Sequence, residues 1–412
     1  MNNPRRVMVT GLGLVTAIGL DEASVWSALV AGRTGLRTMR LHKLEGNLVQ
    51  NGAELDAAPF EPSLPAGLRR ADRSLKFAYE AARQALGGAG RLGGAAAGTQ
   101  DIASIWGSAA GTLETLHQAV IRFADKGPKG MRPSSVPNCM SNSIAANISI
   151  NFQITGANYV VVSACTSSTN AIGVAFRMIR EGQAEAVLCG GTEAAFSPFY
   201  YACWNNLGVL STIADPARAL RSFAADRAGT LLGEGAGALL LESHESALRR
   251  GVRIRGEIVG YGESSDATHI TAPSVAGQAK AIRAALASAG IEPAAIGYIN
   301  PHGTGTEAND ATESQAITEA LGAAAATIPV GATKPYFGHT LGASGAIETI
   351  ATLLALEHRL IPPSLNLENP DPACGLCLAG PQPAPLAGDF AMKNSFGFGG
   401  GNAVLILRRG PH

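Results

Sequence analysis

A cysteine and two histidines are the residues of this 412-residue chain best suited to chemistry. Cys165 follows a run rich in β-branched residues and precedes small hydroxylated residues, in YVVVSACTSSTNAIG. This pattern predicts a strand, a tight turn and a helix that begins at the thiol. Because backbone amides and the helix dipole favour an anion there, we expect a lowered thiol pKa and a nucleophilic role. A small buried core cysteine, the role assigned to Cys189, is the alternative.

The histidines, His302 and His339, each follow a predicted strand and lie among glycines and small residues, in YINPHGTGTEAND and ATKPYFGHTLGASG. Strand ends are where α/β sheets place ligand sites. Two histidines at equivalent places, beside one thiol, predict a shared catalytic site. A zinc site is the alternative, but neither histidine has a second cysteine or a carboxylate at a short ligand spacing, so we expect no metal.

Alternating strand and helix patterns must position these three residues. Before residue 250 they predict a helix over 71–86, strands over 184–191 and 235–242, and a helix that Gly251 ends. After it they predict helices over 275–290 and 343–360 and strands over 254–262, 296–300, 327–334, 389–394 and 402–409. We expect an α/β protein of two halves, 1–250 with the nucleophile and 251–412 with both histidines.

Composition excludes several classes of function. Formal net charge is +0 and no basic run stands out, so neither nucleic acid nor an anionic membrane is an expected partner. No apolar stretch reaches the roughly 18 residues that a membrane span needs. The N-terminus lacks the apolar core and cleavage site of a signal peptide, and the cysteines are few. We therefore expect a cytoplasmic protein with reduced thiols.

Other short motifs are weaker. GLGLVTAIG, at Gly11, has the form GxGxxT rather than GxGxxG, and no acidic residue follows at a convincing strand end, which argues against dinucleotide binding. Neither the GxSxG of serine hydrolases nor a P-loop is present. CGLC, at Cys374–Cys377, is interpreted as two loop thiols rather than a redox or zinc motif.

In a series of ordered segments the chain resembles the β-ketoacyl-[acyl-carrier-protein] synthases, closest to the synthase I/II type of the thiolase superfamily. The segments include RRVMVTGLGLVTAIG, SACTSSTNAIG, NPHGTGTEAND, ATKPYFGHTLGASGAIE and NSFGFGGGNAVLIL, in the family's order along nearly the whole chain. The resemblance implies a five-layer α-β-α-β-α thiolase fold of two pseudo-symmetric halves. It also implies that no metal or redox cofactor is needed.

The family's reaction is a decarboxylative Claisen condensation of malonyl-carrier with an enzyme-bound acyl group. By resemblance, Cys165 holds that acyl group as a thioester. His302 and His339 bind the thioester carbonyl of the malonyl unit while carbon dioxide leaves. The backbone amides of Cys165 and Phe398 form the oxyanion hole, and Phe398 is also the gating residue of a glycine-rich loop.

Further residues match supporting positions of the family. Lys334 and Glu348 correspond to the supporting network, although periodicity alone also allows a solvated helix face for Glu348. Ala110 stands where synthase II types carry a bulkier aliphatic residue in the acyl pocket, which predicts room for longer or unsaturated chains. Basic residues near the pocket mouth should dock the acidic carrier protein, and the candidates are Arg69, Arg70 and Arg132.

The expected partners are acyl carrier protein, loaded with acyl or malonyl groups, and a second subunit. That subunit is either another copy of this chain or a chain-length-factor-like protein. The chain itself is not expected to be a non-catalytic chain-length factor, because such subunits lack the nucleophile. A specialised pathway, such as that of polyketides or aryl-polyene-like pigments, and housekeeping fatty-acid elongation both remain open.

Overall fold

The structure is a computed structural model that describes residues 4–42, 44–92 and 98–411. Within these residues nine strands form one mixed sheet in the order β5-β4-β6-β7-β1-β8-β13-β12-β9. Five strands precede residue 250: β1 Val7–Thr16, β4 Ala103–Gly107, β5 Asn158–Val161, β6 Ala186–Glu193 and β7 Gly235–Ser243. Four follow it: β8 Gly256–Ser265, β9 Ile296–Asn300, β12 Phe390–Gly397 and β13 Gly401–Arg409.

The strand directions repeat between the two halves. In the first half, β1, β7 and β6 pair antiparallel in turn, and β6, β4 and β5 then pair parallel. In the second half, β8, β13 and β12 pair antiparallel, and β12 and β9 pair parallel. Val330 extends the second series with a parallel bridge to Ile299. The repeat is the pseudo-symmetry that the resemblance implies.

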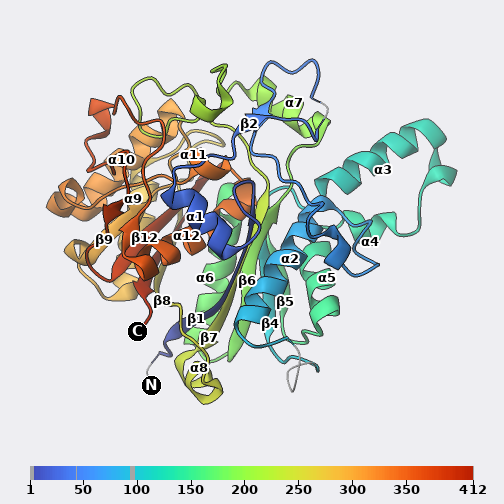
Figure 1. Ribbon diagram of the computed structural model, residues 1–412, viewed down its shortest axis with the longest axis horizontal. Coiled ribbons are helices and arrows are strands. Elements are labelled where there is room, and N and C mark those ends of the chain that lie inside the picture. The colour runs from blue at the N-terminus through green and yellow to red at the C-terminus, as the bar shows by residue number, and fades with distance from the viewer. Residues whose placement is uncertain (1–3, 43, 93–97, 412) are drawn as a thin grey trace.

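Helices complete five layers (Figure 1). The outer layer of the first half contains α2 Arg73–Gly88 and α5 Ser143–Phe152, and that of the second contains α9 Val275–Ala289 and α10 Glu307–Leu321. Between the sheet halves lie α6 Ser167–Arg180 and α12 Ser344–His358. The remaining longer helices are α1 Glu22–Val30, α3 Leu113–Lys126, α7 Pro198–Leu207 and α8 His244–Arg250. The short helices are α4 Ser135–Cys139 and α11 Lys334–Phe337, and the short strands are β2 Arg37–Thr38, β3 Asn51–Gly52, β10 Leu360–Ile361 and β11 Ala384–Pro385.

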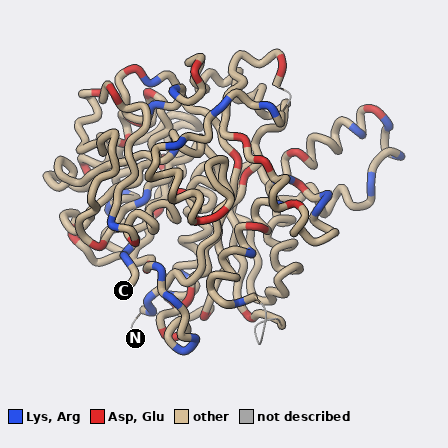
Figure 2. Tube along the Cα trace, in the orientation of Figure 1, with Lys and Arg blue, Asp and Glu red and all other residues tan. Residues whose placement is uncertain are grey.

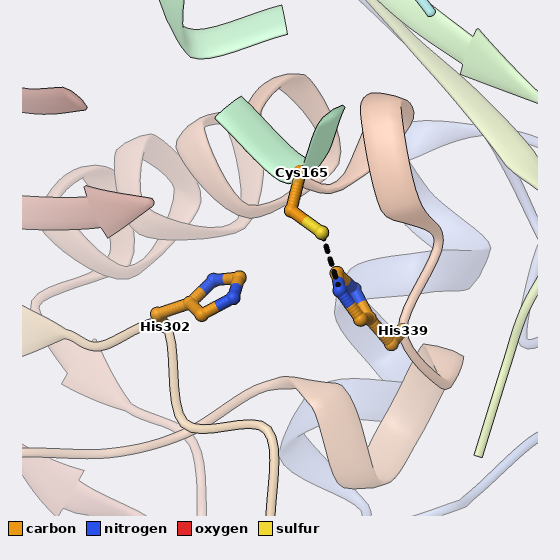
Figure 3. Close-up of side chains that lie close together, drawn as sticks. All are labelled: Cys165, His302 and His339. Atoms are coloured by element: carbon orange, nitrogen blue, oxygen red, sulfur yellow. Dashed lines mark hydrogen bonds between the residues drawn. The ribbon is translucent and has the colours of Figure 1, made fainter. Parts of the chain in front are cut away.

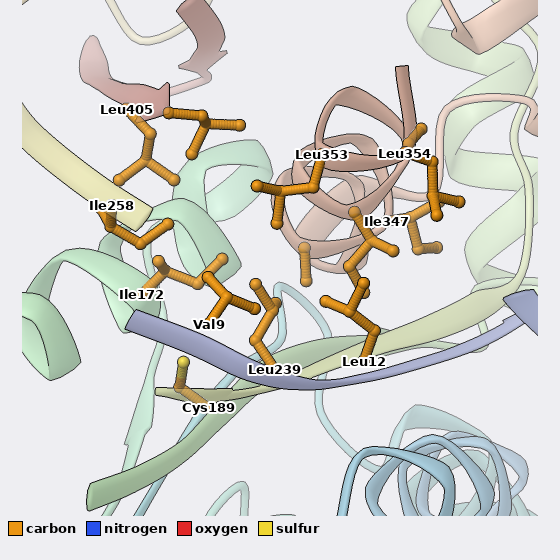
Figure 4. Close-up of a cluster of buried hydrophobic side chains, with 14 of the residues drawn as sticks. Val9, Leu12, Ile172, Cys189, Leu239, Ile258, Ile347, Leu353, Leu354 and Leu405 are labelled. Atoms are coloured by element: carbon orange, nitrogen blue, oxygen red, sulfur yellow. The ribbon is translucent and has the colours of Figure 1, made fainter. Parts of the chain in front are cut away.

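Successive side chains along a strand point to opposite faces of the sheet and therefore belong to different hydrophobic cores. On β7, Leu239 and Leu241 face the inner core with α12, whereas Leu240 faces α2. On β13, Leu405 faces the same inner core while Val404 faces the outer helices. Figure 4 shows the inner cluster, which includes Cys189 as a fully buried core thiol. Burial on both faces explains why these strands are almost continuously apolar.

The GLG motif has a packing role. Gly11 and Gly13 lie within β1, where a Cβ atom would come within 2.0 Å of the carbonyl oxygens of Ala85 and Ala81 on α2. Glycine therefore allows the helix backbone to approach the strand, and no phosphate loop is formed. This arrangement agrees with the rejection of dinucleotide binding.

Most predicted elements are present, with one clear exception. The predicted strand over 327–334 is reduced to isolated bridges at Val330, and Lys334 instead begins α11. Proline at the second position of that helix and a buried lysine side chain favour the turn over an extended strand. Among the described residues, no helix is long and apolar enough to cross a bilayer.

Candidate active site

Cys165 lies at a sharp turn between β5 and α6. Ala164 has a left-handed backbone with φ of 52°, and residues 164–166 form a short 3₁₀ turn before α6 begins at Ser167. A positive φ at a residue other than glycine is strained, and such strain is common where a nucleophile must be presented. The predicted strand, turn and helix around the thiol are therefore present, and the thiol is buried.

The expected direction of the thiol pKa is wrong. Burial raises the pKa of Cys165 to about 11, while Lys334 and the backbone amides of Phe398 and Cys165 oppose that rise without overcoming it. The sequence indicates a helix N-terminus at the thiol, but it does not show how completely the folded chain excludes water from the sulfur. The resting residue is a thiol, so it needs a base when it attacks.

His339 is the nearest base. Its Nε2 lies 3.0 Å from the Cys165 sulfur, and its Nδ1 lies 3.1 Å from the Ser344 hydroxyl (Figure 3). Ser344 also lies 3.0 Å from the Thr340 hydroxyl. Because a hydroxyl can donate or accept, Ser344 can support His339 with a proton on either ring nitrogen.

His302 faces the same thiol from the other side (Figure 3). The two imidazole rings are perpendicular, with centroids 5.3 Å apart. The Lys334 ammonium lies 3.4 Å from Nδ1 of His302. Since an ammonium can only donate, Nδ1 accepts, and the proton of the neutral ring is placed on Nε2. His302 is thereby prepared as a hydrogen-bond donor.

Glu348 forms the buried network that the resemblance implies. Its Oε1 lies 2.8 Å from Lys334 Nζ, and its Oε2 lies 2.7 Å from Lys393 Nζ. All three side chains are buried. A solvated helix face for Glu348 is therefore excluded, and the carboxylate is flanked by two ammonium groups rather than one.

Burial, followed by the charges of Lys334 and Lys393, lowers the pKa of both His302 and His339 well below the usual value. Both rings are therefore neutral near pH 7. The ligand atoms of Cys165, His302 and His339 lie within 4.8 Å of one another, a spacing that a metal ion could also use. A cation at that point would lie beside the Lys334 ammonium and a protonated thiol, which makes this set of groups unfavourable for zinc.

The three residues open into a cavity of about 370 Å³. Phe398 lies at its edge, 37% exposed, and its ring stacks on Trp204 with centroids 5.9 Å apart. Gly399 and Gly400 follow with φ of 85° and 76°, values that favour glycine. The Phe398 ring thus lies on a loop that continues into two glycines with positive φ, and its role as a gate stays a prediction.

The remaining predicted site residues lie elsewhere. Ala110 is half-buried and is not among the residues that line this cavity. Arg69, Arg70 and Arg132 line a separate cleft of about 590 Å³ formed around α2, α3 and α4. The cleft and the cavity share no lining residue.

Two buried glutamates near the site were missed by the sequence analysis. Glu193, at the end of β6, accepts hydrogen bonds from the amides of Ala109, Ala110 and Gly342. Burial raises the pKa of Glu193 to about 7. Glu313 on α10 accepts the amide of His302 at 2.7 Å. A lone carboxylate at the end of an apolar strand, as in AVLCGGTEAAF, is the signal that could have identified Glu193.

Comparison with known proteins agrees with this geometry. Residues 4–247 match the Beta-ketoacyl synthase, N-terminal domain, and residues 255–368 match the Beta-ketoacyl synthase, C-terminal domain. The 3-oxoacyl-[acyl-carrier-protein] synthase 2 of Synechocystis is 41% identical over 98% of each chain. The ishigamide ketosynthase/chain length factor structure has a TM-score of 0.91 and 34% identity, covering 99% of this chain and 100% of that one.

A ketosynthase of a type II PKS, solved with its acyl-carrier protein and bound to the hexaketide, is similar at a TM-score of 0.91 and 28% identity, covering 99% of this chain and 100% of that one. Fold and site thus define a condensing enzyme of the thiolase fold. The chain belongs to the β-ketoacyl synthase family. It is an acyltransferase that forms carbon–carbon bonds, a β-ketoacyl-acyl-carrier-protein synthase.

Proposed function

We propose that Cys165 and His339 carry out the acyl-transfer half of the reaction. His339 Nε2 takes the thiol proton as the sulfur attacks the thioester carbonyl of acyl-carrier. The amides of Cys165 and Phe398, which already act on the sulfur, hold the resulting oxyanion. When the intermediate collapses, the carrier thiolate leaves and receives the proton from His339. The observation that carries this proposal is the 3.0 Å contact between Nε2 and the sulfur.

The condensation half then uses both histidines as donors to the thioester oxygen of malonyl-carrier. The bond to the carboxylate breaks, carbon dioxide leaves, and the electron pair forms an enolate held by His302 and His339. The enolate carbon attacks the Cys165 thioester and forms the new carbon–carbon bond. Cys165 leaves as a thiolate and takes a proton from water, since the condensation consumes one proton overall. For this step the neutral His339 ring carries its proton on Nε2 instead of Nδ1, and the Ser344 hydroxyl beside Nδ1 can then donate to that nitrogen instead of accepting from it.

In our proposal the catalytic residues come from two halves of the chain, which meet at residue 250. Residues 1–250 supply the nucleophile and residues 251–412 supply both histidines. The repeated strand directions support this boundary, as does the helix end at Gly251, where φ is 61°. The proposed compartment is the cytoplasm, supported by six cysteines that are all free.

A dimer is proposed, either of this chain or with a chain-length-factor-like subunit. β5 is an edge strand of the sheet, and Tyr159 and Val162, on it and just after it, are more than half exposed. Along α3, no residue is buried by the rest of the described chain, although Val120 and Phe123 are apolar. An open edge strand with apolar neighbours is a pairing surface. These surfaces support a partner that covers β5 and α3.

The acidic carrier protein is proposed to dock at the cleft around α2, α3 and α4. Arg69, Arg70 and Arg132 line it, and none forms an ion pair with a described residue. Figure 2 shows Lys and Arg residues, with some Asp and Glu among them, along the lobe formed by α3 and the segment after it. Unpaired cations steer an anionic partner more effectively than paired ones.

The double substitution Arg69→Glu/Arg70→Glu is expected to raise KM for acyl-carrier roughly tenfold at low salt, with little change in kcat. The difference from wild type should shrink as salt rises, since exposed charges are screened. Initial rates at several carrier and salt concentrations measure this. Arg249→Glu/Arg253→Glu is the matched control, because it changes the net charge equally outside both the cleft and the cavity. Equal KM values for the two double variants would refute the docking site.

The acyl chains accepted are proposed to be longer or more unsaturated than those of housekeeping elongation. Ala110 supports this because its side chain is small, and its half-exposed position suits a pocket completed by a second subunit. Ordinary fatty-acid elongation is the alternative, favoured by the similarity to a 3-oxoacyl-[acyl-carrier-protein] synthase 2. The ishigamide and type II PKS structures favour the specialised pathway.

A panel of acyl-carriers separates these alternatives. Intact-mass measurement of acylation should show a preference for long or conjugated chains, and Ala110→Ile should shift that preference toward short chains by about tenfold. The substitution adds three carbon atoms, and a single extra methylene in a hydrophobic pocket is already worth about 1–3 kcal/mol, which supports a shift of at least that magnitude. If the wild-type enzyme prefers ordinary saturated chains, the alternative function in fatty-acid synthesis is favoured instead. An unchanged profile for Ala110→Ile would remove Ala110 from the acyl pocket.

A further inference from the structure

Lys393 is a buried cation that the mechanism above does not use. It lies in the middle of β12, opposite Leu405 on β13, and its side chain is fully buried. A lysine in an apolar strand is costly because burial penalises its charge. Because this buried charge lowers the stability of the fold and lies next to a reactive site, it indicates that the lysine has a function there.

The contacts of Lys393 connect two parts of the site. Its Nζ lies 2.7 Å from Oε2 of Glu348 and donates to the Ser395 hydroxyl at 2.6 Å. The Ser395 hydroxyl lies 2.7 Å from that of Thr169, on the helix that begins just after Cys165. Lys393 therefore joins the Lys334–Glu348 pair to the helix of the nucleophile.

We propose that Lys393 is a second positioning cation of the condensation step, which fixes Glu348 from the side opposite Lys334 and favours the negative charge that develops on the malonyl thioester. The inference rests on the proposed function. With both lysines protonated and Glu348 ionised, the trio carries one net positive charge. That charge disfavours imidazolium at His302 and His339, so the rings stay neutral donors, and it stabilises the enolate.

If Lys393 has this role, the rate of decarboxylation should depend on whether Lys393 is protonated. Burial lowers its pKa to about 8, while Glu348 and Glu313 oppose the lowering. The ionisable groups that face it are Glu348 from α12, Lys334 from α11, Glu313 from α10, and the neutral His302 and His339. As pH rises through 8, Lys393 loses its proton and the trio loses its net charge. Decarboxylation should therefore slow on the alkaline side.

The effect on stability has the opposite sign. The unfolded lysine, with a pKa of 10.5, binds more protons than the folded one between pH 8 and 10.5, so this group makes the fold more stable as pH rises there. Replacing Lys393 with methionine should likewise leave the melting temperature unchanged or higher, since Glu348 keeps Lys334. A purely structural lysine would instead lower the melting temperature when removed.

The test compares wild type, Lys393→Met and Lys393→Arg. Lys280→Met is the control, because Lys280 is an exposed lysine outside the cavity. We expect Lys393→Met to acylate Cys165 within threefold of wild type but to decarboxylate malonyl-carrier 10- to 100-fold more slowly, without the alkaline fall. Lys393→Arg should keep more of the rate and lose the alkaline fall, since arginine stays protonated.

The outcomes separate this inference from the proposed function. If wild type does not condense at all, the proposed function fails. If wild type condenses and Lys393→Met matches it in decarboxylation rate and pH profile, only the role of Lys393 fails. Should Lys393→Met not fold, the wild-type profile decides. A decarboxylation rate that is constant from pH 7 to 9.5 would overturn the inference, whereas a fall near pH 8 supports it.

Discussion

Replacing Cys165 with alanine is expected to abolish both acylation of the protein and condensation, with a rate loss on the order of 10⁴-fold or more. Among the described residues that line the cavity, Cys165 supplies the single thiol, and its sulfur lies 3.0 Å from a neutral base. Intact mass after incubation with acyl-carrier measures the first loss, and the yield of extended product measures the second. Decarboxylation of malonyl-carrier should persist, because both histidines remain, as does the Lys334 contact to His302.

Cys189→Ala is the matched control for this prediction. Cys189 is also buried but lies in the inner core, on β6. Its replacement should leave acylation unchanged and lower stability by only about 1 kcal/mol, the usual cost of a small cavity. An acyl adduct that survives in Cys165→Ala, or is lost in Cys189→Ala, would show that the nucleophile is misassigned.

Replacing each of the two histidines with alanine is expected to slow a different step of the reaction. His339→Ala removes the base that lies against the sulfur, so acylation should slow about 10²–10⁴-fold. His302→Ala leaves that contact intact, so acylation should stay within a few-fold of wild type. Condensation in His302→Ala should fall about 10²–10³-fold, since one donor to the developing oxyanion is lost. Single-turnover acylation and decarboxylation, measured separately, resolve the two steps.

Loss of acylation in His302→Ala comparable to that in His339→Ala would contradict this division. The result would mean that either ring can serve the thiol. His302→Asn and His339→Asn extend the comparison, because asparagine can donate a hydrogen bond but cannot take a proton at neutral pH. Asparagine should therefore recover part of the condensation rate at residue 302 and none of the acylation rate at residue 339.

The sequence was sufficient for much of the fold. The helix over 71–86 and the strands over 235–242 and 296–300 have clear periodicity and clear ends, and each is present within a few residues. The predicted strand over 327–334 is wrong, because an apolar run of that length can also form a single bridge followed by a helical turn. Only the neighbouring strand β9 decides how much of such a run pairs.

The site shows the same division between local and tertiary information. Cys165, His302 and His339 were identified because each lies in a distinctive segment. The direction of the thiol pKa was wrong because the helix N-terminus is visible in the sequence, whereas the depth of burial depends on the whole fold. Lys393 was missed for a related reason. DFAMKN predicts a strand, but not that its lysine faces a carboxylate on α12.

The most direct test of the account is a single-turnover condensation followed by mass. Wild-type protein is first acylated with one acyl-carrier, and malonyl-carrier is then added. We predict an acyl adduct on the peptide that contains Cys165, its disappearance on addition of malonyl-carrier, and a carrier-bound β-ketoacyl product that is two carbons longer than the starting chain. An adduct at another residue, or a stable Cys165 adduct that malonyl-carrier never clears even with a partner subunit present, would contradict the account.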